Sequence, residues 1–500
     1  MIRQGRALHT LLVLGLMLGG GASAGVARAH LPPALPVTAT VGASPTPASV
    51  PPGFLGLSLE YQAVPAYAGT GPGTINPTLV QLIRNLTPGQ SPVLRIGGRS
   101  SDTTWWPMPH LRTPPGIKRS LTPAWMQTTR ALAAALDARL ILGVNLAAGN
   151  PKVAGAEARA FVRGIGTRYI QALEVGNEPD LYTHFPLWRA AHRKPMYARP
   201  PSYDMAAVAR DFGRWRAALP RIPLAGPTLA NLPWMPQLGR FLNTVHGVGT
   251  VTFHRYPLKD CFSSPGTPSF PTIPHLFTGY ASDGLAQGLA RYVAVAHAHG
   301  LPFRVDELNS VACAGAPGVS NTFASALWAL DVLFELASVG VDGVNIHTLP
   351  SSYYAPFSFT QSGGAWQATV NPLYYGLLMF AQAAPPGSRL LPVRGLTRQV
   401  RIWATLAPDG TTRTVLINDS PSAPVLVFLR APRSSAAPTL EQLQAPSEAA
   451  TSGVTLGGQS FAAAGDSGTL VGPRSLTQVS SLGGMYSIRL APGSAAMLTS

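Results

Sequence analysis

The sequence has 500 residues, of which 46% are hydrophobic and only 12% are charged. This composition supports a large apolar core and excludes a chain that is disordered throughout, because disordered chains are charge-rich and apolar-poor. The net charge is +16, but the Lys and Arg residues are scattered and form no run of five. The sequence therefore does not indicate nucleic-acid binding, although a basic protein attracts anionic partners such as acidic polysaccharides.

The N-terminus has the pattern of a secretory signal. Arg3 and Arg6 form a basic start, and Leu11 to Leu18 is an apolar run too short to span a bilayer. We expect residues 1–29 to be a signal peptide, with an uncleaved membrane anchor as the alternative. The mature chain is then secreted, periplasmic or on the cell surface, with no membrane attachment after cleavage.

Apolar strand-like runs alternate with helix-like stretches between residues 53 and 386. Eight strands are predicted, at 54–61, 92–98, 138–146, 169–178, 222–227, 249–256, 302–308 and 341–348. Helices are predicted between them, at 122–136, 155–169, 203–219, 284–299, 321–338 and 372–382. Eight such βαβ units predict an α/β fold of the (β/α)8 TIM-barrel type. An open doubly wound sheet is the alternative, but it usually carries a GxGxxG fingerprint, which this sequence lacks.

The pattern changes after residue 386. Residues 387–500 contain short alternating segments separated by Gly, Ser and Pro, which is typical of an antiparallel β-sandwich. Residues 30–52 are a linker rich in Pro, Ala and Thr, with a short strand at 36–41. Because the barrel begins only near Phe54, we expect this N-terminal strand to complete the C-terminal β-sandwich.

Two glutamates follow apolar strand-like runs, in LEVGNEPDLY (173–182) and RVDELNS (304–310). Glu178 closes the fourth predicted strand and Glu307 the seventh, so both lie at the catalytic mouth of a barrel, nearly opposite each other. Such a carboxylate pair is what retaining glycoside hydrolysis needs. Glu174 and Asp306 precede these positions, and we expect them to alternate away from the site.

Other segments carry a family resemblance: LRIGG (94–98), LEVGNEPDLY, HRYP (254–257), residues 304–331 and NPLYYGLLMFAQ (371–382). Together they resemble glycoside hydrolase family 79, the β-glucuronidases and heparanases of the four-seven barrel clan. The GNEPD motif occurs across the clan, whereas the stretch after Glu307 is much more specific. The resemblance runs from about residue 53 to the end. It implies that Glu178 is the acid/base and Glu307 the nucleophile, with no metal or organic cofactor.

Further residues are expected to bind substrate or to hold the carboxylates. Arg95 ends the second strand, where its charge can lower the pKa of Glu307, with a structural ion pair as the alternative. Asn177 can donate to a sugar 2-hydroxyl. Three more polar residues near strand ends are candidates for contacts with sugar hydroxyls, with a structural role as the alternative for each: Glu60, Asp102 and His347.

The resemblance also implies how the substrate is recognised. Tyr256 would hydrogen-bond to Glu307, and the backbone N–H groups of Cys313 and Ala314 would bind a sugar carboxylate. Ala314 departs from the glycine-rich pattern of heparanases, but any residue except proline offers a backbone donor. A tyrosine after the eighth strand, Tyr354 or Tyr353, would assist.

The two cysteines, Cys261 and Cys313, predict one disulfide in an exported chain, with two free thiols as the alternative. Two cysteines alone make no zinc site, and no HExxH spacing is present.

The predicted partner is thus a carbohydrate that contains uronic acid. We expect hydrolysis of β-linked glucuronic acid. One alternative keeps the mechanism but takes a neutral β-glucoside or β-xyloside. The other is a carbohydrate-binding surface protein without turnover.

Overall fold

The computed structural model describes residues 33–395, 400–432 and 437–500. The predicted signal peptide, residues 1–29, lies outside this part of the chain. Within the described ranges, no helix combines the length and the hydrophobicity needed to cross a bilayer. The segment Ala34–Ser500 holds both the barrel and the β-sandwich.

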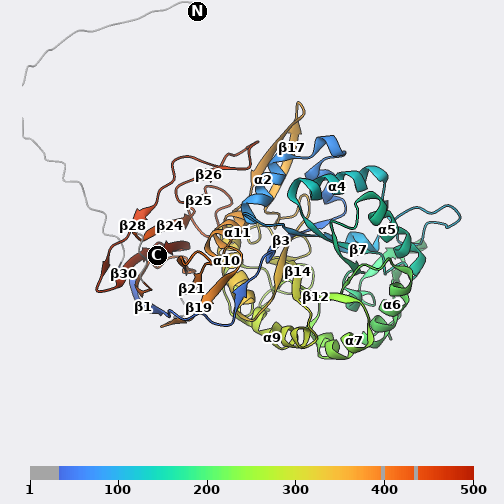
Figure 1. The fold of residues 1–500 in the computed structure, drawn as a ribbon, viewed down its shortest axis with the longest axis horizontal. Helices are drawn as coiled ribbons and strands as arrows, with labels where there is room; N and C mark the ends of the chain where they lie inside the picture. The colour runs from blue at the N-terminus through green and yellow to red at the C-terminus, as the bar shows by residue number, and fades with distance from the viewer. Residues whose placement is uncertain (1–32, 396–399, 433–436) are drawn as a thin grey trace, which may run out of the picture. The chain divides into compact units, whose positions relative to one another are not determined.

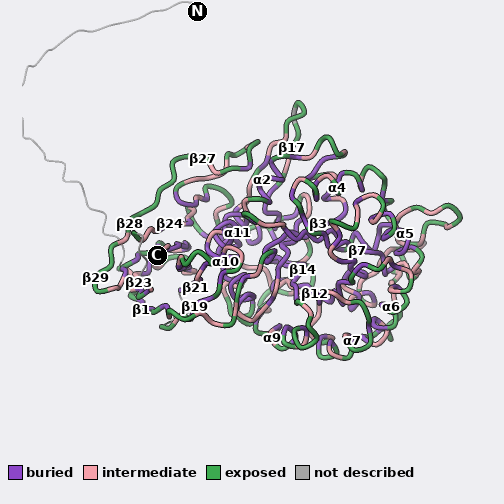
Figure 2. The backbone as a smooth tube through the Cα atoms, in the orientation of Figure 1, coloured by how far each residue is buried: buried purple, intermediate pink, exposed green. Residues whose placement is uncertain are grey.

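Eight parallel strands form a closed barrel, which confirms the predicted fold class (Figure 1). In chain order they are β3 (Leu55–Glu60), β4 (Val93–Gly97), β7 (Arg139–Val144), β8 (Ile170–Val175), β11 (Leu224–Leu229), β12 (Val248–Arg255), β14 (Phe303–Leu308) and β16 (Gly343–Thr348). Each lies within a predicted run or overlaps it. Every residue of β3, β4, β14 and β16 is buried (Figure 2), as expected for parallel strands covered on both faces.

Helices surround the barrel strands (Figure 1). The longer ones are α2 (Pro77–Leu86), α4 (Pro123–Leu136), α5 (Pro151–Gly164), α6 (Met205–Ala218), α7 (Leu238–Thr244), α9 (Asp283–Ala298), α10 (Phe323–Ser338) and α11 (Pro372–Ala383). Short α1 (Ala63–Ala68), α3 (Arg99–Asp102) and α8 (Ile273–Leu276) lie in connections. The sequence prediction missed α2 and α7.

A cap residue followed by proline begins several of these helices. The Asn150 side chain accepts a hydrogen bond from Lys152 N, and Pro151 takes the first helical position, where no N–H is needed. This cap explains why α5 begins at Pro151 and not near 155, as predicted. Asn76 caps α2 in the same way, ahead of Pro77.

Two sheets form the C-terminal β-sandwich, as predicted. The first has the order β20-β1-β23-β30-β29, and the second runs β2-β19-β21-β22-β31-β24-β25. The principal strands are β1 (Leu35–Val41), β19 (Ser388–Leu391), β20 (Val393–Arg394), β21 (Val400–Leu406), β22 (Thr412–Asn418), β23 (Val425–Arg430), β24 (Thr439–Gln444), β30 (Met485–Leu490) and β31 (Ser494–Thr499). Short β2 (Ser49–Val50), β25 (Thr455–Leu456) and β29 (Ser481–Leu482) lie at sheet edges. The N-terminal strand β1 pairs in parallel with β23, which confirms that it completes the sandwich.

Candidate active site

Glu307 lies near the C-terminal end of β14 and is 7% exposed. Its Oε2 atom accepts a hydrogen bond from Arg95 NH1 at 2.5 Å, and its Oε1 atom accepts one from the Tyr256 hydroxyl at 2.8 Å. His254 and His347 approach Oε2 to 3.8 and 3.7 Å. Burial opposes ionisation, but the charges of these groups and the Tyr256 hydroxyl hold the pKa of Glu307 well below its usual range. Glu307 is therefore an anion, the state that a nucleophile needs.

Glu178 follows β8 with φ 52° and ψ 56°, a left-handed conformation that costs strain in a residue with a side chain. Its backbone N–H donates to Thr228 O, and Pro179 fixes the chain after it. The Oε1 atom lies 3.1 Å from His254 Nδ1. One carboxylate oxygen of Glu178 lies within 4.8 Å of one of Glu307, so strands four and seven bring the two acids together.

Arg95 is fully buried in β4 and donates hydrogen bonds to several residues of the site. Its Nε donates to Glu174 Oε2 at 2.7 Å, and its NH2 donates to Asn177 Oδ1 at 2.9 Å. Because the Asn177 oxygen is thus engaged, its amide N–H groups are the atoms available to a substrate hydroxyl. The direct contact between Arg95 and Glu307 supplies the charge that the sequence analysis expected.

The expectation that Glu174 and Asp306 alternate away from the site is wrong. Both side chains are 0% exposed, and Glu174 shares Arg95 with Glu307. Glu174 lies within β8 and contacts Arg95 in the barrel interior, whereas Glu178 follows the strand, after Gly176, whose φ of 78° ends the regular alternation. Asp306 sits where the pairing register of β14 shifts against both β12 and β16. Such irregularities break strict alternation and let adjacent residues approach the same interior.

His254 at the end of β12 is the main site residue that the sequence analysis missed. The signal was present in HRYP, because His254 and Tyr256 are two residues apart and share a face. Arg95 only donates hydrogen bonds, so His254 Nε2, 3.3 Å from NH2, accepts and Nδ1–H donates to Glu178. Burial lowers the pKa of His254, but Glu307 and Glu178 outweigh burial, so the net pKa is raised. Asp306 Oδ1 lies 3.6 Å from the other ring nitrogen, Nε2.

Two of the three candidates for contacts with sugar hydroxyls lie beside Glu307. His347 Nδ1 lies 3.0 Å from Ser58 Oγ, and its Nε2 lies 3.8 Å from Glu60 Oε1. Glu60 Oε2 accepts from Ser100 N. Gly98, with φ 73°, permits this contact, because a Cβ there would lie 2.5 Å from Glu60 Oε1. His347 therefore lies between Glu60 and Glu307, within 3.8 Å of both carboxylates.

The third candidate, Asp102, is engaged within the protein. It accepts a hydrogen bond from the Tyr182 hydroxyl at 2.6 Å, and that hydroxyl accepts one from Asn177 N at 3.2 Å. Burial raises the pKa of Asp102 to about 7. In this geometry Asp102 supports the Asn177–Glu178 turn, which is the structural alternative stated for it.

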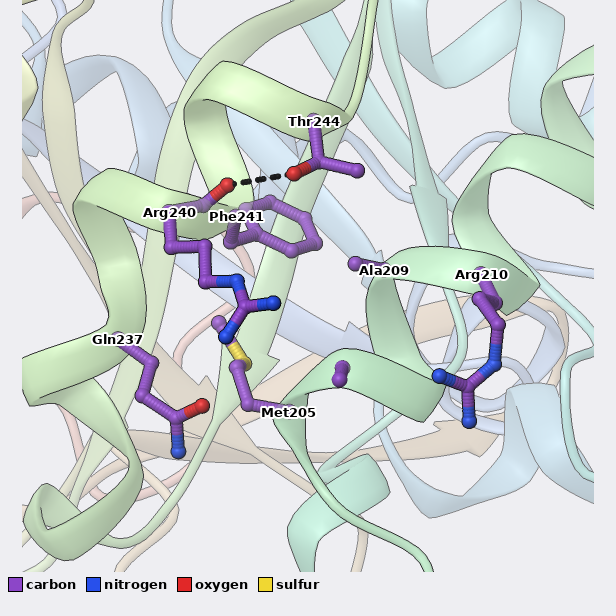
Figure 3. A pocket seen from close by; sticks show the side chains of 8 residues that line it. Met205, Ala209, Arg210, Gln237, Arg240, Phe241 and Thr244 are labelled. Atoms are coloured by element: carbon purple, nitrogen blue, oxygen red, sulfur yellow. Dashed lines mark hydrogen bonds between the residues drawn. The ribbon is translucent and has the colours of Figure 1, made fainter.

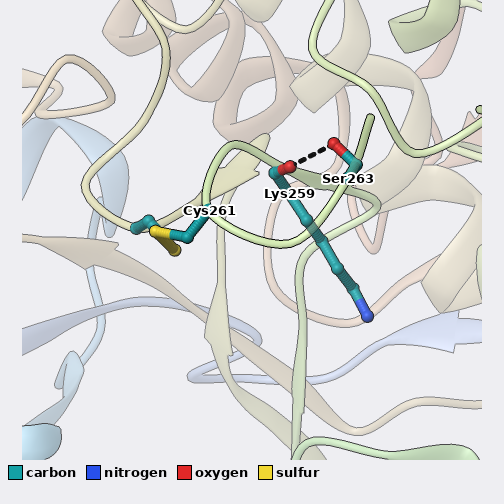
Figure 4. Close-up of a disulfide and its surroundings, with 4 residues drawn as sticks. Lys259, Cys261 and Ser263 are labelled. Carbon is teal, nitrogen blue, oxygen red and sulfur yellow. Dashed lines mark hydrogen bonds between the residues drawn. A yellow bond between two sulfur atoms is a disulfide. The ribbon is translucent and has the colours of Figure 1, made fainter. Parts of the chain in front are cut away.

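The loop after β14 is held by the predicted disulfide between Cys261 and Cys313, whose Cα atoms are 6.1 Å apart (Figure 4). Cys313, Ala314 and Gly315 all have positive φ angles, of 70°, 71° and 84°. Ala314 O accepts from Tyr353 N at 2.8 Å, which docks the loop onto the segment after β16.

Of the two tyrosines considered there, Tyr354 is the one that lies beside Tyr256, the hydrogen-bond donor to Glu307. It is 4% exposed, and its ring centroid lies 6.2 Å from that of Tyr256. Tyr353 is 48% exposed.

Two groups of side chains have ligand atoms close enough for a metal: Glu174, His254 and Asp306, and Glu178, His254 and Glu307. Arg95 already places its positive charge between Glu174 and Glu307, so a cation there would meet the guanidinium. These residues do not fit a metal.

A cavity of about 180 Å³ between α6 and α7 (Figure 3) lies in the helical layer. It is lined by Met205, Ala206, Ala209, Arg210, Gln237, Arg240, Phe241 and Thr244. This lining contains no carboxylate or histidine and so offers no acid/base pair.

Comparison with known proteins agrees with this geometry. No family model matches the chain. It is 25% identical over 419 residues to a β-glucuronidase of Neurospora crassa, covering 73% of this chain and 71% of that protein. A 4-O-α-L-rhamnosyl-β-D-glucuronidase of Fusarium oxysporum shares the fold with a TM-score of 0.70 at 19% identity, over 93% of this chain and 100% of the other. A family 51 arabinofuranosidase of Xanthomonas axonopodis pv. citri also shares the fold, with a TM-score of 0.64 at 15% identity. The match covers 93% of this chain and 99% of the other. The chain is accordingly a glycosidase, similar in sequence to a β-glucuronidase and in fold to glycoside hydrolases.

Proposed function

We propose that this glycosidase is an exported, retaining β-glucuronidase that cleaves β-linked glucuronic acid from glycans or glycoconjugates. Glu178 protonates the leaving oxygen while Glu307 attacks the anomeric carbon and forms a glycosyl ester. Glu178 then takes a proton from water, whose oxygen displaces the Glu307 carboxylate. The nearest Glu178 and Glu307 oxygens lie within 4.8 Å, which suits direct attack better than the wider spacing of about 6.5–9.5 Å that an inverting enzyme needs for its water.

The observation that carries the choice of sugar is the left-handed run at Cys313, Ala314 and Gly315. Successive backbone N–H groups in a tight turn can form a concavity that binds an anion. Two of the three are not glycine, so the conformation is strained, as residues at ligand sites often are. These observations support a carboxylate on the sugar as the anion that this loop, six residues after Glu307, binds.

Export is part of the proposal. The pattern in residues 1–29 supports it, and so does the Cys261–Cys313 disulfide, since such bonds persist mainly in oxidising compartments. N-terminal sequencing of protein recovered from the culture medium or periplasm tests it. An unprocessed Met1 on a cell-associated protein would contradict it.

The test of activity uses chromogenic β-glucuronide, β-glucoside and β-xyloside substrates between about pH 3 and 7. We expect glucuronide turnover in the unmodified enzyme and its loss in Glu178→Gln and Glu307→Gln. Glu335→Gln is the matched control. Burial and neighbouring Asp331 and Asp283 raise the pKa of Glu335 to about 8, so glutamine resembles its protonated form in this range.

Each other outcome refutes a different part of the proposal. Turnover of a neutral sugar instead would keep the mechanism and reject the role of the 313–315 loop. Absence of turnover on all three, in a folded protein that still binds glucuronides, would favour a carbohydrate-binding protein. An NMR time course that shows the α-anomer of glucuronic acid released first would reject retention.

A further inference from the structure

Two carboxyl groups are buried beneath the catalytic pair without any place in the mechanism above. Glu174 and Asp306 are both 0% exposed. Glu174 Oε2 accepts from Arg95, but Glu174 Oε1 and both Asp306 oxygens have no hydrogen-bond donor among the described residues. Glu174, His254 and Asp306 each offer an atom within 4.8 Å of the others. Unpaired carboxylate oxygens in a barrel interior are costly and require an explanation.

We propose that Glu174 and Asp306 share one proton, so that Asp306 is a neutral acid whose O–H donates to Glu174 Oε1. Two ionised carboxylates side by side in a low dielectric repel each other strongly. One shared proton removes one of these charges and converts two orphan acceptors into a donor and an acceptor. The pair then belongs to the charge arrangement around Glu307, and this inference rests on the proposed role of Glu307 as nucleophile.

The surroundings of Asp306 favour the protonated form. The charged and titratable groups that face it come from four strands: Arg95, Glu174, His254, Arg304 and Glu307.

The two arginines among these groups are engaged elsewhere, whereas His254 Nε2 lies 3.6 Å from Asp306 Oδ1. Arg95 donates directly to Glu174 and Glu307, and Arg304 donates to Asn345 Oδ1 and Gly53 O. Burial and the charge of Glu174 raise the pKa of Asp306 well above its ordinary value.

The shared proton makes Asp306 a positioning residue. With Asp306 neutral, Arg95 balances two carboxylates, Glu174 and Glu307, and not three. The Asp306 O–H fixes Glu174, Glu174 fixes Arg95, and Arg95 orients Glu307. Ionisation of Asp306 would add a charge beside Glu307 and draw the guanidinium away from it.

Two substitutions of Asp306 distinguish its role as a neutral hydrogen-bond donor from a role as a negative charge. Asp306→Asn keeps a neutral donor, whose Nδ2–H can bind Glu174 Oε1, so we expect kcat within about threefold of the unmodified enzyme. Asp306→Val fills similar space without a polar atom and leaves Glu174 Oε1 unpaired, so we expect kcat/KM to fall about 10- to 100-fold. An Asn variant that folds and is as impaired as the Val variant would overturn the proposal.

Infrared spectroscopy can detect the proton shared by Glu174 and Asp306, and the measurement needs no substrate. At about pH 8, above the pKa of about 7 of Asp102, we expect the C=O band of a protonated carboxylic acid that disappears in Asp306→Asn. If that variant does not fold, enzyme labelled with ¹³C at aspartate carboxyls shows the band of a protonated aspartate through the isotope shift, and Asp331→Asn removes the contribution of Asp331, another buried aspartate whose pKa is raised. Absence of a protonated aspartate would overturn the proposal.

Metal analysis gives an independent check. Stoichiometric metal that resists dialysis and is lost in Asp306→Asn would also overturn it. Because neither measurement uses substrate, an enzyme inactive on glucuronides can still show the band, and an active enzyme can lack it. Failure of this inference is thereby distinguished from failure of the proposed function.

Discussion

Removal of the Tyr256 hydroxyl tests directly how the site stabilises the carboxylate of Glu307. Tyr256 donates to Glu307 Oε1 at 2.8 Å, while Arg95 holds the other oxygen. Hydrogen bonds to charged groups contribute about 1.5–3 kcal/mol. Tyr256→Phe removes this bond and leaves the Arg95 contact in place.

In the proposed mechanism, Tyr256→Phe should slow mainly the second chemical step, the hydrolysis of the glycosyl ester. When water breaks the glycosyl ester, Glu307 leaves as a carboxylate, and the Tyr256 hydroxyl stabilises the charge that develops on Oε1. Loss of about 1.5–3 kcal/mol at that stage corresponds to a decrease of about 10- to 100-fold in the rate of deglycosylation. The covalent intermediate then accumulates, so KM falls together with kcat.

Stopped-flow kinetics with an aryl β-glucuronide that carries a good leaving group measures both steps. We expect a burst of phenolate equal to the enzyme concentration, followed by slow turnover. The acid limb of the pH profile should move upwards, because the Tyr256 hydroxyl contributes to the low pKa of Glu307.

The matched control is Tyr374→Phe. Its buried hydroxyl donates to Leu82 O, between α11 and α2, so kcat should stay unchanged. A Tyr256→Phe enzyme with kcat within about twofold of the unmodified enzyme and no burst would refute the reasoning.

Three further predictions follow from the same contacts. Glu178→Gln should reduce turnover of substrates with poor leaving groups about 100- to 10,000-fold but spare the glycosylation step with activated substrates. Azide should restore turnover and give the β-glucuronyl azide as product. Equal loss on both kinds of substrate would argue against an acid/base role. Replacing Cys261 and Cys313 together by serine should cost up to about 4 kcal/mol of unfolding free energy, and should raise KM for the glucuronide more than for any neutral glycoside; an unchanged Tm would contradict this. Burial raises the pKa of Asp102 from 3.8 to about 7, so its contribution to stability is present below about pH 4 and is lost as pH rises to about 7. Asp102→Asn should therefore make Tm depend less on pH across that range. A variant whose Tm changes with pH in parallel with that of the unmodified enzyme would rule the effect out.

Much of the barrel was predictable because hydrophobic runs and helix periodicity are local signals. All eight barrel strands were found, since each buries both faces and reads as a continuous apolar run. The helix α7, which is short, was missed. The apolar pattern alone starts α5 near residue 155, whereas the cap motif Asn150-Pro151 marks its true beginning.

The site was less accessible to sequence reasoning. Glu178 and Glu307 stand out by their positions after strands. The interior position of Asp306 depends on register shifts of β14 that no local pattern encodes, and the contact between Glu174 and Arg95 joins two strands that are far apart in the sequence. His254 was overlooked because an isolated histidine carries no partner in the sequence. Its contacts with Glu178 and Arg95 arise only when three strands close into a barrel.

The position of β1 has a consequence for how this protein can be dissected. β1 lies between β20 and β23, so the first strand of the described chain fills the interior of a sheet whose other members come last. A fragment that starts at the barrel would leave β20 and β23 with open backbone edges, which recruit strands from other molecules. Catalytic fragments cut at the boundary near residue 53 should therefore self-associate through these edges, whereas circular permutants that attach β1 after β31 by a flexible linker should not.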